Sequence, residues 1–488
     1  MSDAAELSHA RRMLVLAICC MSLFIVGLDV TVVNVALPSI ERELHASVSG
    51  LQWVVAAYSL VLASLLMLSG STGDRVGRRR TFQVGLALFT LGSLLCSLAP
   101  SLGALVVFRM LQAVGGSMLN PVAMSIITNT FTEPAERARA IGIWGGVIGL
   151  SMALGPVVGG LLVSSVGWRS IFWVNIPVGI AAIALTAVFV PESRAPRPRR
   201  IDPVGQLLVM LTLATLVYGI IQGPRDGWTS PVILSCFSAA AAAAAAFALY
   251  ETHHSEPLLD TRFFRSAPFS GATMIAISAF AALGGFLLLS TIYLQDARGF
   301  SALHAGLYML PMAAMTAICS PLSGRIVGSR GPRGPLIGAS IALMVSALTL
   351  TRLGADTSTA SLVVSYLLFG LGFGLVNAPI TNTAMAGMPR TQAGVAAAVA
   401  STSRQVGSAL GVAVIGSAVV SALAGPLKTG FVSASHIGWW LIAGCGAAVL
   451  VLGLVTTGGW ARQTAGRVAA EFAPTSADFR GAGLPRSD

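Results

Sequence analysis

Charged side chains are scarce in this sequence. They make up 10% of the 488 residues, whereas 55% of the residues are hydrophobic and the mean hydropathy is +0.80. Ordinary soluble domains are about 25% charged, so this composition excludes a soluble globular protein. It also excludes intrinsic disorder, because disordered chains are poor in apolar residues. The apolar runs are unbroken and do not alternate with polar residues, which excludes an outer-membrane barrel.

Polar stretches long enough to form a separate domain are also missing. We identify fourteen apolar runs, each close to the roughly 20 residues that cross a bilayer. No stretch between them exceeds about 30 residues, which is too short for an independent core. The six cysteines fall inside apolar runs and form no CxxC pair or Cys/His cluster, so neither a metal site nor a disulfide framework is expected. The sequence therefore predicts an all-α membrane protein with fourteen transmembrane helices.

Basic residues are divided unevenly between the two sides of these helices. With a cytoplasmic N-terminus, 22 of the 30 Lys and Arg residues lie on the cytoplasmic side and 6 on the other. This follows the positive-inside rule, so both termini are expected in the cytoplasm. Topology alone accounts for the basic loops, and no nucleic-acid binding is expected. The preference for arginine and alanine is typical of a GC-rich bacterial genome, which places the chain in a bacterial cytoplasmic (inner) membrane.

An internal repeat links the two halves of the chain. The segment Leu68-Ser69-Gly70 returns at 322–324, and Gly77 matches Gly331 at the same offset. Repeated halves are typical of transporters, whose substrate site lies between the halves. The repeat predicts two six-helix bundles with two inserted helices. The expected organisation is a cytoplasmic N-terminus at 1–12, a bundle at 13–190, a linker at 191–202, inserted helices at 203–250, a cytoplasmic connection at 251–269, a second bundle at 270–457 and a cytoplasmic tail at 458–488.

Three ionisable residues lie inside predicted helices, namely Asp29, Arg109 and Arg404. A charge in hydrocarbon costs roughly 2.5–3.5 kcal/mol or more, so such residues are functional candidates. Counted from the outer ends of their helices, Asp29 in the span 13–37 lies roughly 12 Å deep and Arg109 roughly 9 Å deep, so the two are expected to face each other. A carboxyl group in such a setting can load and release a proton. The alternative is a permanent ion pair that only orients the bundle.

Further polar residues inside the runs are candidates for a substrate cavity. Gln112, Gly116 and Asn120 share one helical stripe with Arg109, which either lines a cavity or packs against the first helix. Arg404 binds backbone carbonyls, sets the potential of the cavity or lies at a water-filled cleft. Trp53 contacts substrate or marks the outer membrane interface, where tryptophan is common. The cavity candidates are Asn34, Trp53, Tyr58, Gln112, Asn120, Asn377, Asn382 and Arg404.

Four ordered motifs add to this pattern. They are LDVTVVNVALP at 28–38, GDRVGRRR at 73–80, RMLQAVGG at 109–116 and GPVVGG at 155–160. In the second motif, glycines permit a tight turn and Asp74 can accept an arginine pair, although a basic loop that only sets topology would explain the arginines. In the fourth, Pro156 bends a helix and glycines admit a close neighbour, although ordinary close packing would use the same residues.

With these motifs, the chain from about residue 13 to 457 resembles the major facilitator superfamily. Within it, the chain is similar to the fourteen-helix drug:proton antiporters of the QacA/EmrB-like group. The resemblance implies that Asp29, with Arg109, couples transport to protons. It also implies a latch that favours an outward-open state, made of Gly73, Asp74, Arg75, Gly77 and Arg78. The antiport motif would be Gly155, Pro156, Gly159 and Gly160. Ala113 stands where the family usually has glycine, which affects how closely that helix can pack.

The sequence therefore favours a proton-coupled antiporter that exports lipophilic, cationic or amphipathic small molecules, such as drugs and antibiotics, by alternating access. We expect a monomer that needs only its substrate, protons and the lipid bilayer. It contains no ATP-binding loop, metal cluster or nucleophile–base pair, so neither enzymatic activity nor a cofactor is expected. The leading alternative is uptake or facilitated diffusion of a polar metabolite. A receptor is disfavoured because no extramembrane signalling domain is predicted.

Overall fold

The computed structural model describes residues 8–195, 202–254, 260–354, 356–386 and 393–471, and every regular element in these ranges is helical. The first half of the chain forms α1 (His9–Leu44), α2 (Val48–Val76), α3 (Arg78–Ser97), α4 (Leu102–Thr130), α5 (Pro134–Ser165), α6 (Ser170–Trp173) and α7 (Asn175–Phe189). Two helices follow, α8 (Pro203–Asp226) and α9 (Pro231–His253). The second half contains η1 (Thr261–Arg265), α10 (Ala267–Ile292), η2 (Tyr293–Ala297), α11 (Ala302–Arg330), α12 (Arg333–Leu350), α13 (Thr359–Met385), α14 (Ala393–Ala422), α15 (Leu427–Thr456) and α16 (Gly459–Glu471).

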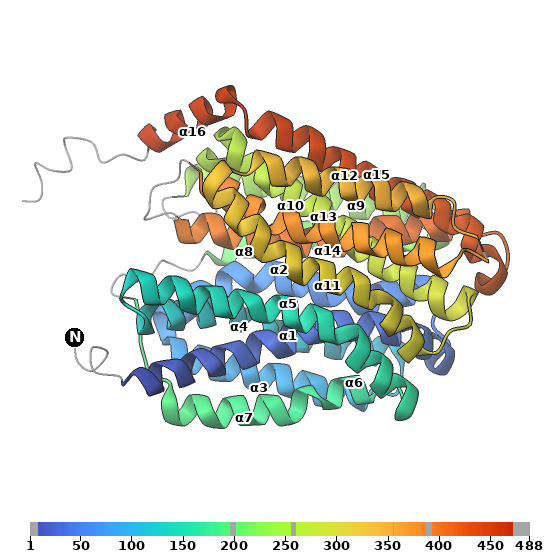
Figure 1. Cartoon of the computed structure of the whole chain (residues 1–488), viewed down its shortest axis with the longest axis horizontal. Helices are drawn as coiled ribbons and strands as arrows, with labels where there is room; N and C mark the ends of the chain where they lie inside the picture. The colour runs from blue at the N-terminus through green and yellow to red at the C-terminus, as the bar shows by residue number, and fades with distance from the viewer. Residues whose placement is uncertain (1–7, 196–201, 255–259, 355, 387–392, 472–488) are drawn as a thin grey trace, which may run out of the picture.

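The long helices run roughly parallel to the longest axis of the molecule, as Figure 1 shows. We call the end where α1 begins and α16 lies the linker end, and the end where α1 stops the opposite end. Five helices that start at the opposite end begin after a serine whose side chain accepts a backbone N–H of the first turn, which satisfies one free donor at each start. These serines are Ser47, Ser101, Ser230, Ser301 and Ser358.

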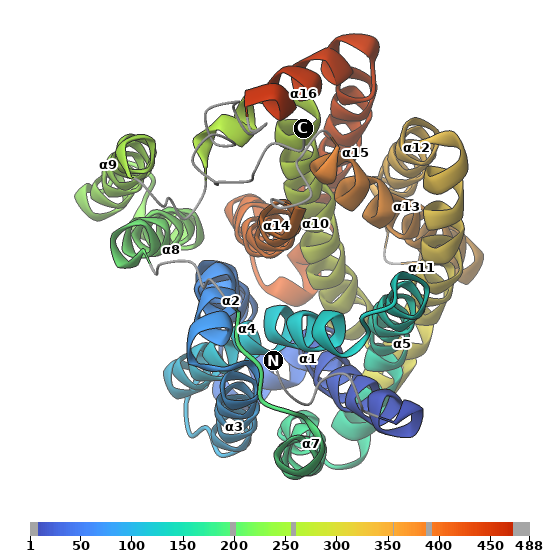
Figure 2. The same cartoon turned by 90° about the vertical axis from the view of Figure 1, so that its left-hand side faces the viewer.

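Two groups of helices pack separately (Figure 2). In the first, α3 packs on α4 and α7, α1 on α5, and α2 on α4; in the second, α10 packs on α14 and α15, α11 on α13, and α12 on α13 and α15. We call α1–α7 the first bundle and α10–α15 the second bundle. They meet along two seams, α5 against α11 and α2 against α14.

The hydrogen bonds across these seams lie toward the opposite end. Gln52 Nε2 donates to the carbonyls of Val412 and Ala413 at 2.9 and 3.0 Å, and Gln295 Nε2 donates to Val35 O at 2.7 Å. The backbone N–H of Leu303 donates to Ser164 Oγ at 3.1 Å. In the described part of the chain, every direct hydrogen bond between the two bundles lies in this half. The bundles are therefore closed against each other at the opposite end.

Helix α8 contacts both bundles. Gln206 donates from α8 to Ser64 O on α2, and Tyr218 packs its ring against Trp53 at 5.9 Å between centroids. On the other side, Ser417 Oγ of α14 donates to Ile220 O of α8 at 2.8 Å. The inserted pair α8–α9 lies beside the α2–α14 seam in Figure 2. It is thus anchored to both halves of the molecule.

Several helices are longer than the apolar runs suggested. The first was expected at 13–37 but continues through Pro38 to Leu44, so Asp29 lies about 22 Å from its end instead of 12 Å. Twelve helices in the described residues are long and apolar enough to cross a membrane. α3 and α5 are not among them; the described apolar part of α5 is the shorter stretch Leu154–Ser165. The expected count of fourteen spans therefore stays a prediction.

Candidate functional site

The centre of the first bundle contains a buried ion pair. Arg109 Nη1 on α4 donates to Asp29 Oδ2 on α1 at 2.5 Å, and both side chains are almost completely buried. Their distances from the helix ends differ because α1 projects beyond α4 at the opposite end, yet the two residues lie level. The expected pairing of Asp29 with Arg109 is thus present in the structure, although this alone does not assign a role to either residue.

The carboxylate of Asp29 also accepts hydrogen bonds from two amides. Gln112 Nε2 donates to Oδ1 at 2.8 Å, and Asn175 Nδ2 donates to the same oxygen at 3.2 Å. Both amides donate to Ser93 Oγ as well, at 2.8 and 3.2 Å. Gln112 in turn accepts from Arg109 Nη1 at 2.6 Å, so the five side chains form one closed network. Three donors, from Arg109, Gln112 and Asn175, therefore point at the carboxylate oxygens of Asp29.

Local packing brings these groups together. A side chain at Gly92 of α3 would overlap the backbone of Gln112, so only glycine lets α3 approach α4 this closely. Ser93 follows directly and reaches the amide of Gln112. Asn175 is the first residue of α7, immediately after the short helix α6, so the break between α6 and α7 directs its side chain toward the network.

Aromatic rings enclose the guanidinium of Arg109. The ring of Tyr58 on α2 lies 4.1 Å from the guanidinium carbon, and that of Phe172 on α6 lies 5.9 Å away. Such cation–π contacts stabilise a desolvated cation by roughly 2 kcal/mol. Val54 O accepts a long 3.5 Å hydrogen bond from Nε. The hydroxyl of Tyr58 is buried and has no hydrogen-bond partner in the described residues.

The network is enclosed within the first bundle. All of its members come from α1, α3, α4 and α7, flanked by α2 and α6, and the Asp29 side chain is 1% exposed. Tyr58 and Gln112, two of the cavity candidates, are fully buried around this ion pair, and their place at a substrate cavity stays a prediction. In this conformation, a proton can reach Asp29 only if the surrounding side chains move.

The remaining cavity candidates are scattered. Asn34 is buried on α1 and donates to Val30 O, while Trp53 packs against α8. Asn120 is half-buried with an unpartnered amide oxygen, and Asn382 is exposed. Among the described residues, two candidates in the second bundle, Arg404 and Asn377, are connected through Thr381. Arg404 Nη2 donates to Thr381 Oγ1 at 2.6 Å, and Thr381 Oγ1 donates to Asn377 O at 3.4 Å.

Arg404 has no carboxylate partner in the described ranges. Its guanidinium carbon lies 5.9 Å from the ring centroid of Phe280, and its Nε atom is buried without a partner among the described residues. Within the part of the chain that the structure describes, its only direct side-chain hydrogen bond is the one to Thr381. A half-buried cation on the seam-lining helix α14 is suited to interact with a polar or negatively polarised group that enters between the bundles.

The loop between α2 and α3 is tied to its own bundle. Asp74 Oδ1 accepts hydrogen bonds from Nε and Nη2 of Arg78 at 3.1 and 2.9 Å, and Asp74 O accepts one from the Ala195 N–H. Gly77 has φ +125°, a conformation that favours glycine, and the carboxylate of Glu192 lies directly over it. Gly73 is buried and Arg75 is exposed. The latch role of these residues stays a prediction.

The small residues of α5 contact both neighbouring helices. Gly155 and Gly159 face Thr31 and Val32 of α1, where added side chains would overlap. Gly160 faces the backbone of α11 at Ala302, and Gly306 of α11 faces the carbonyl of Pro156. Both contacts are so close that a side chain at either glycine would push α5 and α11 apart. The expected antiport motif therefore lies at the α5–α11 seam, and its function is not tested by this contact.

Sequence reasoning missed several residues of these sites. Asn175 follows a tryptophan-rich run and could have been found as a polar residue inside an apolar helix. Ser93 carries no such signal, because serine is common in membrane helices. Gln52 and Gln295 lie near predicted span ends, where amides are ordinary. No group of three or more His, Cys, Asp or Glu residues that could hold a metal ion occurs among the described residues.

Known proteins resemble the chain along most of its length. The family model described as Major Facilitator Superfamily matches residues 19–412. The chain is 40% identical over 408 residues to the multidrug resistance protein Stp of Mycobacterium tuberculosis, which covers 84% of the chain and 76% of that protein. It is 39% identical over 393 residues to the tetracenomycin C resistance and export protein of Streptomyces glaucescens, covering 80% and 73%.

Solved structures show the same fold. A bacterial homologue of the human lysosomal transporter Spinster, described as inward-facing and unoccupied, matches with a TM-score of 0.63 at 18% identity, over 95% of this chain and 98% of that one. A peptide transporter in complex with sulfate matches with a TM-score of 0.65 at 16% identity, over 93% and 95%. At these identities the likeness concerns the fold alone.

Proposed function

Because the chain belongs to the Major Facilitator Superfamily, we propose that it exports lipophilic, cationic or amphipathic small molecules by alternating access, driven by the proton gradient. Relatives at 34–40% identity are named multidrug resistance or antibiotic resistance proteins, which supports drug efflux as the activity. The substrates named for those proteins differ, so the relatives support a class of cargo and not a single compound.

The buried Asp29–Arg109 pair is the observation that carries the proton coupling. Asp29 is the acid at the centre of the first bundle, and its carboxylate pairs with one arginine and accepts hydrogen bonds from two amides. Protonation would remove the negative charge that these donors stabilise, and so weaken the contacts that join α1 to α4 and α7. A proton at Asp29 therefore changes how the helices of this bundle hold together, which is the requirement for coupling.

The orientation of the chain in the membrane sets the direction of the proposed transport cycle. We place the linker end in the cytoplasm of a bacterium, since arginines concentrate there. The structure is then closed to the outside, and the ion pair represents the state after Asp29 has released its proton inward. Cargo loads from the cytoplasmic side in this state. Opening to the outside hydrates Asp29, which takes up a proton as cargo leaves, and the protonated form returns.

We further propose that α3 and α5 also cross the membrane, which gives fourteen spans. α3 has 20 residues, about 30 Å of helix, and α5 has 32. Both pack along neighbours that qualify as spans, α3 on α4 and α5 on α1. Reporter fusions after Ser97 and Ser165 should then report the outside, and fusions after Val76 and Thr130 the cytoplasm.

The loop at 73–78 is proposed as the latch of the outward-open state. In the present, outside-closed state its acid is occupied by Arg78 of the same loop. When the cytoplasmic ends of the bundles approach each other, Asp74 and the exposed Arg75 become available for a contact with the second bundle. A charge contact of this kind is made in one state and broken in the other.

The proposal is tested in proteoliposomes with an imposed proton gradient and a lipophilic cation such as ethidium. We expect wild-type protein to accumulate ethidium against its gradient, and Asp29→Asn to fold but to lose this accumulation. Asp202→Asn is the matched control, because Asp202 is an equally buried acid that caps α8 outside the network, and asparagine caps equally well. Full proton-driven transport by Asp29→Asn would refute the coupling role.

The same vesicles separate the alternative, uptake or facilitated diffusion of a polar metabolite. A facilitator equilibrates its substrate and ignores the proton gradient, whereas an exporter concentrates cargo only while the gradient lasts. Collapse of the gradient with a protonophore should therefore release accumulated ethidium from wild-type vesicles.

A further inference from the structure

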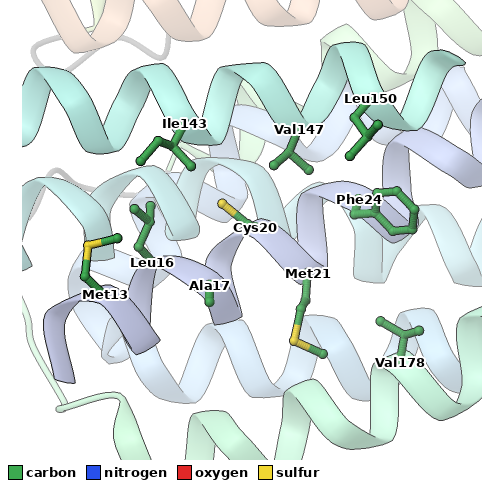
Figure 3. A pocket seen from close by; sticks show the side chains of 10 residues that line it. All are labelled: Met13, Leu16, Ala17, Cys20, Met21, Phe24, Ile143, Val147, Leu150 and Val178. Carbon is green, nitrogen blue, oxygen red and sulfur yellow. The ribbon is translucent and has the colours of Figure 1, made fainter. Parts of the chain in front are cut away.

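An apolar groove of about 390 Å³ lies on the first bundle, away from both seams. Figure 3 shows it between α1, which forms its floor, and α5 and α7, which form its walls. Its lining contains no charged residue; it includes Leu16, Ala17, Met21, Val147, Leu150 and Val178. Ile143 and Leu150 on the α5 wall are about half exposed, so the groove is open toward the surroundings of the helices, which in a membrane are lipid.

The length of the groove matches one leaflet. It follows α1 from Met13 to Phe24, which is about 16 Å at 1.5 Å per residue. The hydrocarbon core of a bilayer is about 30 Å thick, so one leaflet contributes about 15 Å. The groove begins near the linker end of α1 and stops one turn before Asp29. It therefore spans the depth of the leaflet on that side.

Two arginines, Arg12 and Arg139, lie at the linker end of the groove. Arg12 of α1 pairs with Glu136 of α5 at 2.5 Å and joins the two helices there. Arg139 is exposed. It precedes Ile143 by four residues and so lies on the same face of α5 as the groove wall. The paired Arg12 is neutralised, which leaves Arg139 as the exposed cation at this mouth.

We propose that this groove binds one acyl chain of an anionic phospholipid from the leaflet at the linker end, with the phosphate held by Arg139. Water does not occupy an apolar groove, and the molecules that surround it in a membrane are acyl chains. Arg139 selects a negative headgroup, by about fivefold for one cation near the surface. The bound chain fills the space between α1 and α5, and so braces the helix that meets α11 at the seam.

The test uses the purified full chain and native mass spectrometry with titrated palmitoyl-oleoyl phosphatidylglycerol or phosphatidylcholine. We expect wild-type protein to retain one phosphatidylglycerol more tightly than phosphatidylcholine. Arg139→Gln should reduce that preference about fivefold, because the cation at the mouth of the groove is lost. Ala17→Trp fills the floor of the groove and should lose the tightly held lipid. Leu150→Trp fills it from the other wall, in case the first variant does not fold.

The matched control is Ile180→Trp, which adds the same ring to an exposed position of α7 and should retain the lipid as wild type does. Unchanged lipid retention by both groove-filling variants would overturn the proposal, and so would equal retention of the two phospholipids by wild type. Displacement of the lipid by tetraphenylphosphonium at a one-to-one ratio would assign the groove to cargo instead. Because the assay measures lipid and not transport, its result is independent of the proposed efflux.

Discussion

Removing the charges of Asp29 and Arg109 one at a time and together separates a coupling role from a purely structural one. Breaking a buried pair by removing one partner costs about 3–5 kcal/mol, because the other charge stays buried. Asp29→Asn should lower the free energy of unfolding more than Arg109→Gln does, because it leaves Arg109 buried with a charge that it cannot lose. Arg109→Gln should cost less, because Asp29 keeps its hydrogen bonds from Gln112 and Asn175 and can also become protonated.

The double variant Asp29→Asn/Arg109→Gln replaces the ion pair with two amides that can bond to each other and to the same neighbours. We expect its free energy of unfolding to recover most of the loss, with a coupling energy of about 3 kcal/mol between the two changes. Stability is measured by SDS-induced unfolding of the purified protein, followed by circular dichroism. All four proteins are then compared in one detergent at one pH.

Transport decides between the two roles. If the pair only orients the helices, the double variant should regain proton-driven ethidium accumulation along with its stability. If Asp29 couples transport to protons, the double variant should be stable and should exchange ethidium across the membrane, but should not accumulate it. A double variant that is both stable and fully driven by the proton gradient would refute our reasoning about this acid.

Three further predictions concern the seams and the loop between α2 and α3. Gly306→Leu should prevent α11 from packing against Pro156 O. A cysteine placed at Ser164 should then react with a thiol reagent more than ten times faster. An unchanged labelling rate would contradict the close contact of α5 with α11. Gln52→Leu removes the donor to two carbonyls of α14 and should shift the equilibrium about tenfold away from the state closed at the opposite end, as measured by distances between spin labels on the two bundles. Gly77→Ala should lower the free energy of unfolding by about 1–2 kcal/mol because of the positive φ at this position, and any overlap with Glu192 would add to this loss. The midpoint of thermal unfolding should fall accordingly. An unaltered midpoint would argue against backbone strain at Gly77.

The sequence predicted the central ion pair because its signal is chemical and sparse. Charges inside apolar runs are rare, so Asp29 and Arg109 could be found without any knowledge of packing. Their supporting residues could not all be found in this way. Ser93 and Asn175 are ordinary polar residues, and only the close approach of α3 to α4 at Gly92 and the break before α7 bring them to the carboxylate.

Helix boundaries and cavity assignments were less predictable. Pro38 was read as the end of the first helix, but proline only removes one backbone donor and the helix continues past it. Tyr58 and Gln112 were predicted as cavity candidates because polar groups avoid lipid, with packing against the first helix as the alternative for the stripe of Gln112, and the cavity role stays a prediction. A buried network satisfies the same requirement, and periodicity cannot distinguish a helix face that meets water from one that meets other side chains. Likewise, the apolar pattern of 203–250 does not show that α8 is bonded to both bundles.

That dual attachment of α8 constrains the direction in which the protein can open. Gln206 and Tyr218 connect it to α2, and Ile220 connects it to Ser417 of α14, so this flank acts as a hinge. In the described residues, the α5–α11 flank is joined by one hydrogen bond, from the Leu303 N–H to Ser164 Oγ, and by contacts of small residues that can separate without breaking many bonds. When the opposite end opens, the two bundles should therefore separate most beside α5 and α11 and least beside α8.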